Sequence, residues 1–181
     1  MNSNNKPFTI RRMTKDAALL ALICLVGMFS IPLGANVKVS LQLLMVFIIC
    51  LTADSFIDCI FITSLYLVMG LFLPIYAGFT AGISPTFGYV IAFVVASPAI
   101  YFLNKIPKLH PILRMSIACL VGLLICYIIG TAFMMVYLNW ELGQTLLVSV
   151  VPYLPFDAAK IVVAVLIMLI LPESVYKEKN I

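Results

Sequence analysis

The sequence predicts an all-α integral membrane protein whose six transmembrane helices form a compact bundle with an outward-facing ligand pocket. The first observation is composition: 64% of the 181 residues are hydrophobic, 10% are charged, and the mean hydropathy is +1.19. Soluble domains average about 45–50% apolar and about 25% charged residues. The second is that apolar runs recur near the length of about 20 residues that crosses the hydrocarbon layer. The third is an acid and a base, Asp157 and Lys160, at the start of the last run.

No polar stretch is long enough for a soluble domain, so residues 1–181 are expected to form a single membrane domain. The first run follows several basic residues, as in a secretory signal, but more runs follow and no clear cleavage site appears. The second and third runs are short and the fifth is long, which suits unequal, tilted helices around a cavity. The predicted spans are roughly 16–33, 39–53, 57–73, 86–103, 112–138 and 154–171.

Basic residues predict the orientation. Six spans place both termini on one side of the membrane, and the positive-inside rule makes the side with most Lys and Arg residues cytoplasmic. Only Lys38 and Lys160 fall on the other side, so the last span begins at the outer face of a plasma membrane. The cytoplasmic basic residues are Lys6, Arg11, Arg12, Lys15, Lys105, Lys108, Arg114, Lys177 and Lys179.

The stretch PYLPFDAAK (Pro152–Lys160) predicts the polar end of a small-molecule site. Asp157 and Lys160 are three residues apart and therefore share one helix face. Each charge costs roughly 2.5–3.5 kcal/mol at the centre of a membrane helix, and less near its ends. A structural ion pair between the two is the alternative, although desolvation makes such a pair little better than apolar residues.

The uncharged connector between the third and fourth spans, LPIYAGFTAGISPTFGY (Leu73–Tyr89), contains Tyr76, Phe79 and Tyr89, whose rings can cover an apolar ligand. Ser84 followed by Pro85 predicts the N-cap and first residue of a helix. The fourth and sixth spans both begin on the outer side, where their free N–H groups can receive an anion. The alternative is an interfacial loop that only joins two spans.

Other functional classes have little support in the sequence. The net charge of +4 lies in connectors and tails, which disfavours nucleic-acid binding. The five cysteines form no Cys-x-x-Cys pair and are interpreted as packing residues, so no metal or cofactor is expected. The sole histidine, His110, lies in a basic connector without a paired-histidine spacing, and no phosphate-binding loop is present. These features disfavour an intramembrane acyl or prenyl transferase, or any other enzyme.

At GFTAGISPTFGY (Gly78–Tyr89) and PYLPFDAAK (Pro152–Lys160), the sequence resembles the BioY family, the biotin-binding S components of energy-coupling factor (ECF) transporters. SLQLLMVF (Ser40–Phe47) matches the second helix of the family more loosely, and the six-span layout extends the similarity over nearly the whole chain. Phe156 is a departure, because many members have glycine there. The resemblance implies a bacterial membrane receptor that binds biotin from outside. It also implies a transmembrane scaffold subunit and two ATP-hydrolysing subunits as partners.

The resemblance also assigns roles to residues. Asp157 would accept hydrogen bonds from the ureido N–H groups of biotin, while Lys160 would donate to the ureido carbonyl or pair with the tail carboxylate. The expected ring-covering residues are Tyr76, Phe79 and Tyr89, and the expected neutral hydrogen-bonding residues are Gln42, Ser84 and Thr86.

Ala17 and Ala21 have the small-xxx-small spacing that lets helices approach closely, and in the resembled family this element faces the scaffold. Three alternatives stay open beside this interpretation. One is an S component or stand-alone facilitator for another vitamin, the second is a bundle subunit that only scaffolds a complex, and the third is the transferase.

Overall fold

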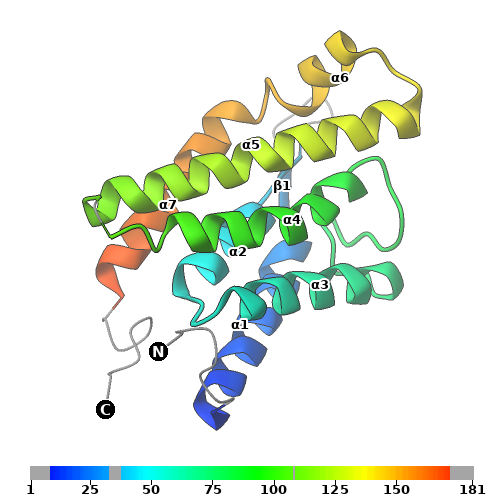
Figure 1. The fold of residues 1–181 in the computed structure, drawn as a ribbon. Coiled ribbons are helices and arrows are strands. Elements are labelled where there is room, and N and C mark those ends of the chain that lie inside the picture. Colours follow the sequence, from blue (N-terminus) through cyan, green and yellow to red (C-terminus); the bar gives the residue numbers. More distant parts are fainter. Residues whose placement is uncertain (1–8, 33–37, 108, 172–181) are drawn as a thin grey trace.

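The computed structural model describes residues 9–32, 38–107 and 109–171 of the chain. Within these residues the fold has seven helices and one two-stranded antiparallel sheet (Figure 1). The elements in chain order are α1 (Ile10–Met28), β1 (Ser30–Pro32), β2 (Lys38–Ser40), α2 (Gln42–Thr52), α3 (Phe56–Phe72), α4 (Phe87–Leu103), α5 (Pro111–Leu138), α6 (Leu142–Ser149) and α7 (Leu154–Ile170).

Six of these helices lie on the six predicted ranges, and the structure adds one more, α6. This helix has eight residues within the connector between the fifth and sixth predicted spans, so it is much shorter than a spanning helix. The predicted all-helical class is confirmed, and the structure adds one short hairpin in which β1 and β2 pair with Ser30 opposite Ser40. The hairpin shortens the first helix, which ends at Met28 rather than at the predicted residue 33.

Helix length shows which of the described helices could cross a membrane. By length and composition, α5 is the one described helix long and apolar enough to cross a membrane by itself. Helices α6 and α7 satisfy the same criterion as a pair bent by 50° at the break between them. Helices α2, α3 and α4 are apolar but have 11, 17 and 17 residues. Six spans therefore stay a prediction.

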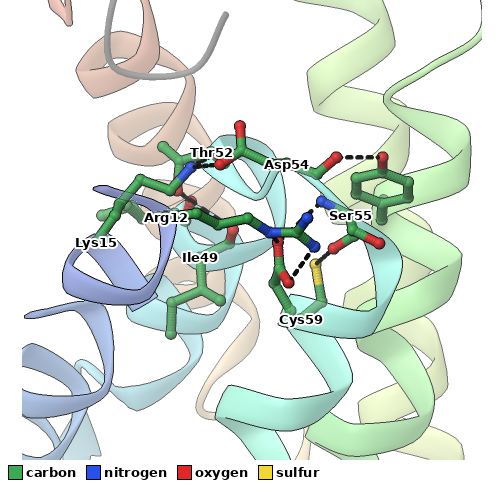
Figure 2. Close-up of polar contacts among 10 residues, drawn as sticks. Arg12, Lys15, Ile49, Thr52, Asp54, Ser55 and Cys59 are labelled. Atoms are coloured by element: carbon green, nitrogen blue, oxygen red, sulfur yellow. Dashed lines mark hydrogen bonds and ion pairs between the residues drawn. The ribbon is translucent and has the colours of Figure 1, made fainter. Parts of the chain in front are cut away.

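Charged side chains hold the start of α1 against the turn between α2 and α3 (Figure 2). The Arg12 guanidinium donates through Nε to Asp58 Oδ2 at 2.9 Å and through a second nitrogen to Asp58 Oδ1. Asp58 also accepts from the backbone N–H of Ser55 at 3.1 Å, which completes a capping box at the start of α3. Lys15 pairs with Asp54 on the same turn.

The end of α4 reaches the same turn, since the Tyr101 hydroxyl donates to the backbone carbonyl of Asp54 at 3.0 Å. Lys105 lies over the Tyr101 ring at 5.0 Å. Several basic residues that predicted the cytoplasmic side therefore gather at one end of the bundle, termed here the basic end and defined by Arg12, Lys15 and Lys105. The predicted cytoplasmic residues Lys6, Lys108, Lys177 and Lys179 lie outside the described residues.

Helices α4 and α5 run side by side, with the α3–α4 connector and α6 near one end and the α4–α5 connector near the other (Figure 1). Two glycines allow this approach. A Cβ on Gly130 would lie 2.4 Å from Cε1 of Tyr89, and a Cβ on Gly88 would lie 2.3 Å from Cβ of Phe133. The missing side chains leave room for aromatic rings of the facing helix.

Backbone contacts fix the α3–α4 connector to its neighbours. Gly78 and Phe79 have φ values of 76° and 58°, so the chain turns sharply in the left-handed region. The Gly78 N–H donates to the carbonyl of Met28 at 2.9 Å, and the Gly82 N–H donates to the carbonyl of Gly70 at 2.9 Å. The connector is thus held between the end of α1 and the end of α3.

Candidate functional site

A cavity of about 440 Å³ opens between the helices and is lined by the first turns of α4, whose other end carries Tyr101 and Lys105 at the basic end. Its walls come from β2, α2, the α3–α4 connector, α4, α5, α6 and α7, so segments far apart in sequence meet there. Apolar residues such as Leu43, Val90, Phe93 and Leu123 make part of the wall. Its polar lining residues include Ser40, Gln42, Thr80, Ser84, Thr86, Tyr89, Tyr127, Ser149, Tyr153, Asp157 and Lys160.

Asp157 and Lys160 form an ion pair in the wall of this cavity. Lys160 Nζ lies 2.7 Å from Asp157 Oδ1, and the two residues are 8% and 5% exposed. Helix α7 begins at Leu154 with Pro155 in its first turn, which leaves Asp157 near the free N–H groups where an acidic residue is favoured. Lys160, one helical turn further on, is mildly disfavoured by the same dipole, and Asp157 offsets this.

The second oxygen of the carboxylate is bound from another helix. The Tyr127 hydroxyl of α5 donates to Asp157 Oδ2 at 2.7 Å. Among the described residues, each carboxylate oxygen therefore receives one side-chain donor. Since an ionised carboxylate can accept about four hydrogen bonds and an ammonium group has three donors, both members of the pair keep capacity for a ligand.

Gln42, at the start of α2, presents a buried amide to the cavity. Its Nε2 donates to the Tyr66 hydroxyl, which in turn donates to the carbonyl of Ile75 at 3.0 Å. The Ser40 hydroxyl donates to Gln42 Oε1 at 3.3 Å. This chain of hydrogen bonds orients the amide and ties α2, α3 and the α3–α4 connector together beside the cavity.

The α3–α4 connector and the first turn of α4 supply the next part of the wall. Ser84 and Thr86 lie with their hydroxyl oxygens 3.1 Å apart. The predicted N-cap role of Ser84 is wrong, because α4 begins at Phe87 with Thr86 in the N-cap position and without a side-chain cap. Pro85 accordingly precedes the helix, and both hydroxyls stay available at the cavity.

Comparison with known proteins identifies the family. A model of the BioY family matches residues 1–177. The chain belongs to the BioY family.

Two relatives agree with this membership. A biotin transporter BioY from Thermotoga maritima is 29% identical over 164 residues, which cover 88% of this chain and 95% of the relative. The crystal structure of an S-component for biotin from an ECF-type ABC transporter superposes with a TM-score of 0.81 at 21% identity. This match covers 94% of this chain and 100% of that chain, and it shows a shared fold.

The two segments that carry the BioY resemblance, Gly78–Tyr89 and Pro152–Lys160, meet at the cavity. The structure brings together seven of the eight residues predicted to bind a ligand: Gln42, Tyr76, Ser84, Thr86, Tyr89, Asp157 and Lys160.

Phe79 is the exception among the predicted BioY site residues. It is 60% exposed, does not line the cavity and packs edge-on against Phe29 with ring centroids 5.8 Å apart. The left-handed turn at Gly78 and Phe79 places this ring next to the end of α1. Its predicted part in covering a ligand therefore has no support from the geometry.

Several lining residues of this BioY-family cavity were not predicted. Tyr127 and Cys126 come from the middle of α5, Ser149 is the last residue of α6, and Trp140 and Tyr153 flank α6. The fifth predicted span is apolar on all sides, so no periodicity marked the face of α5 that turns inward. The one available signal was a phenol group, Tyr127, near the centre of a long apolar run.

Ala17 and Ala21 lie on the exposed face of α1, opposite the buried residues Arg12, Ile23 and Gly27. Leu25, on the same helix, is also exposed. The small-xxx-small pair predicted to contact a scaffold subunit is therefore accessible in the isolated chain.

Proposed function

We propose that this chain is the biotin-binding membrane subunit, the S component, of an ECF-type vitamin uptake transporter. Membership of the BioY family supports the proposal, as does the name of the Thermotoga maritima relative. The observation that carries it is the position of the Asp157–Lys160 pair, which lies in the wall of a cavity rather than in a packed core. Such a role makes the chain a binding and transport protein and not an enzyme.

The pair complements one edge of the ureido ring of biotin. That edge presents an N–H donor beside a carbonyl acceptor, and the protein presents the Asp157 carboxylate beside the Lys160 ammonium, 2.7 Å apart. Both new hydrogen bonds would involve a charged partner, which makes them about twice as strong as neutral ones. We therefore assign the ring to the pair and the tail carboxylate to another part of the cavity.

The size and lining of the cavity suit the thiophane ring and tail of biotin. Binding sites for small molecules usually measure about 300–1,000 Å³ and are mostly apolar. Val90, Phe93 and Tyr76 can cover the thiophane ring and the aliphatic tail. Nanomolar affinity needs about 12 kcal/mol, so enclosure by these walls must supply most of it.

The surface supports a membrane location and a need for partners. Val136 in α5 and Ile170 in α7 are 80% and 82% exposed, as expected for side chains that face lipid. Helix α5, and α6 with α7 as a bent pair, are long and apolar enough to cross a membrane. We place the basic end and both termini in the cytoplasm and the cavity toward the outside, following the positive-inside rule. The separate scaffold and ATP-hydrolysing subunits of an ECF transporter would then bind the chain, with Ala17 and Ala21 facing the scaffold.

Ligand titration of the purified chain tests the proposal. Biotin should raise the melting temperature, while thiamine and riboflavin should not. Lys160→Ala and Asp157→Asn should weaken biotin binding by roughly 2–5 kcal/mol, because each change leaves its partner buried without a counter-charge. Lys105→Ala, at the basic end, is the matched control and should bind normally. Stabilisation by another vitamin instead would establish the alternative S component, and unchanged affinity in Lys160→Ala would remove the assigned role.

Two biotin analogues test the orientation of the ligand. In 2-iminobiotin a cationic guanidinium replaces the urea, so it should bind weakly beside Lys160 and recover relative to biotin in Lys160→Ala. Biotinamide, which lacks the tail charge, should bind much as biotin does. Loss of biotinamide binding with retention of 2-iminobiotin would assign Lys160 to the tail carboxylate.

A further inference from the structure

Among the described residues, Tyr127 is the one outside α7 whose side chain donates a hydrogen bond to the Asp157 carboxylate. It lies on α5, is half-buried, and lines the same cavity as Asp157. Lys160, the other donor, belongs to the same helix as Asp157, three residues further on. The carboxylate is therefore held by one contact within α7 and one contact from α5.

These two contacts have different geometric consequences. The terminal torsion of an aspartate has a broad energy minimum, so a single partner leaves the carboxylate plane free to rotate. Without the phenol, rotation would let both oxygens of Asp157 approach the Lys160 ammonium. The carboxylate and the ammonium would then use their hydrogen-bonding capacity on each other. The Tyr127 hydroxyl keeps Oδ2 away from Lys160, so a lone pair on each oxygen and two ammonium donors stay available to a ligand.

We infer that Tyr127 is a positioning residue of the binding site, which holds the Asp157 carboxylate in the orientation that receives a ureido N–H group. The inference rests on the proposed function and assigns to α5 a part in recognising the ligand. Preorganisation of this kind raises affinity because the bound geometry exists before the ligand arrives.

Removal of a single oxygen atom tests this assignment. Tyr127→Phe keeps the ring and removes the hydroxyl, and it should weaken biotin binding about 10- to 100-fold, the range expected for a hydrogen bond to a charged group. The matched control is Tyr137→Phe on the same helix, since Tyr137 is exposed and stacks on Phe133. This control should change affinity less than about twofold.

A double-mutant cycle separates positioning from simple packing. Titrations of wild-type protein, Tyr127→Phe, Asp157→Asn and the double variant, carried to millimolar biotin, give the coupling between the two sites. A positioning role predicts that Tyr127→Phe loses most of its effect once Asp157 is Asn. The inference would be overturned if Tyr127→Phe lowered biotin affinity by the same factor in the wild-type and in the Asp157→Asn background, or if it left the affinity unchanged. Failure of the wild-type chain to bind biotin would instead overturn the proposed function itself.

Discussion

Two buried ion pairs in this chain differ in how completely the protein satisfies them. Both carboxylate oxygens of Asp58 accept from Arg12, and one also accepts from the N–H of Ser55. Asp157 lines a cavity, and the described residues give each of its oxygens one side-chain donor. The first pair holds three protein donors on one buried carboxylate and joins α1 to α3. The second keeps hydrogen-bonding capacity, which is what a binding site requires.

Loss of the Arg12–Asp58 pair should destabilise the fold and leave ligand binding intact. Arg12→Ala should lower the free energy of unfolding by about 3–5 kcal/mol, because Asp58 then stays buried without its cation. The Lys15–Asp54 pair is more exposed, with side chains 20% and 16% accessible, so Lys15→Ala should cost clearly less. Thermal unfolding in detergent measures both variants. Equal losses would show that burial does not distinguish the pairs, and weakened biotin binding would contradict a purely structural role.

Residue spacing predicted part of the site and missed the rest for a physical reason. Asp157 and Lys160 are three apart on one helix, so local geometry was enough to place them together. The contact between Tyr127 and Asp157 joins residues 30 positions apart, and it depends on how α5 and α7 pack. Spacing could not place Phe79, because a local left-handed turn, not its aromatic character, decides where its ring lies.

At the scale of elements, the close approach of α4 and α5 shapes the cavity. Tyr89 fits over Gly130, and from there its hydroxyl donates to the carbonyl of Ser149 at 3.2 Å, at the end of α6. One side chain of α4 therefore contacts both α5 and the break before α7. The position of Tyr89 in the cavity wall depends on the missing side chain at Gly130.

Gly130→Ala should therefore weaken biotin binding several-fold and destabilise the protein by about 1–3 kcal/mol. The added Cβ would lie 2.4 Å from Tyr89 Cε1, so the ring must leave its place in the wall. Gly143→Ala in α6 is the matched control, because a Cβ there meets nothing within 4 Å. It should bind biotin normally and gain up to about 1 kcal/mol of stability. Normal affinity in Gly130→Ala would mean that Tyr89 does not contribute to binding.

Hydropathy predicted the boundaries of the long helices and did not predict the short elements. Helices α3, α4, α5 and α7 begin and end close to the apolar runs that predicted them. The three-residue strands β1 and β2 and the eight-residue α6 are too short to give a periodic signal. Contacts with distant residues accompany them instead, such as the hydrogen bond from the Tyr89 hydroxyl to the carbonyl of Ser149 at the end of α6.

At the scale of the whole molecule, α1 connects the two ends of the bundle. Its first turns carry Arg12 and Lys15, which pair with the α2–α3 turn. Near its other end, a Cβ on Gly27 would lie 3.2 Å from Cγ of Gln42, a residue of the cavity wall. The opposite face of the same helix exposes Ala17 and Ala21. A partner bound to that face would contact α1, the helix that reaches both the basic end and the cavity.

This arrangement predicts that binding and assembly can be separated by mutation. Ala21→Phe adds a large side chain to the exposed face of α1, where close approach of a partner helix needs a small residue. The isolated variant should bind biotin with unchanged affinity, because the added ring points away from the cavity. Co-expressed with the scaffold and ATP-hydrolysing subunits, it should fail to co-purify with them, and cells that carry it should not accumulate labelled biotin. Ala132→Phe, at an exposed alanine of α5, is the matched control and should assemble and transport normally. Normal assembly in Ala21→Phe together with loss in Ala132→Phe would move the docking face from α1 to α5.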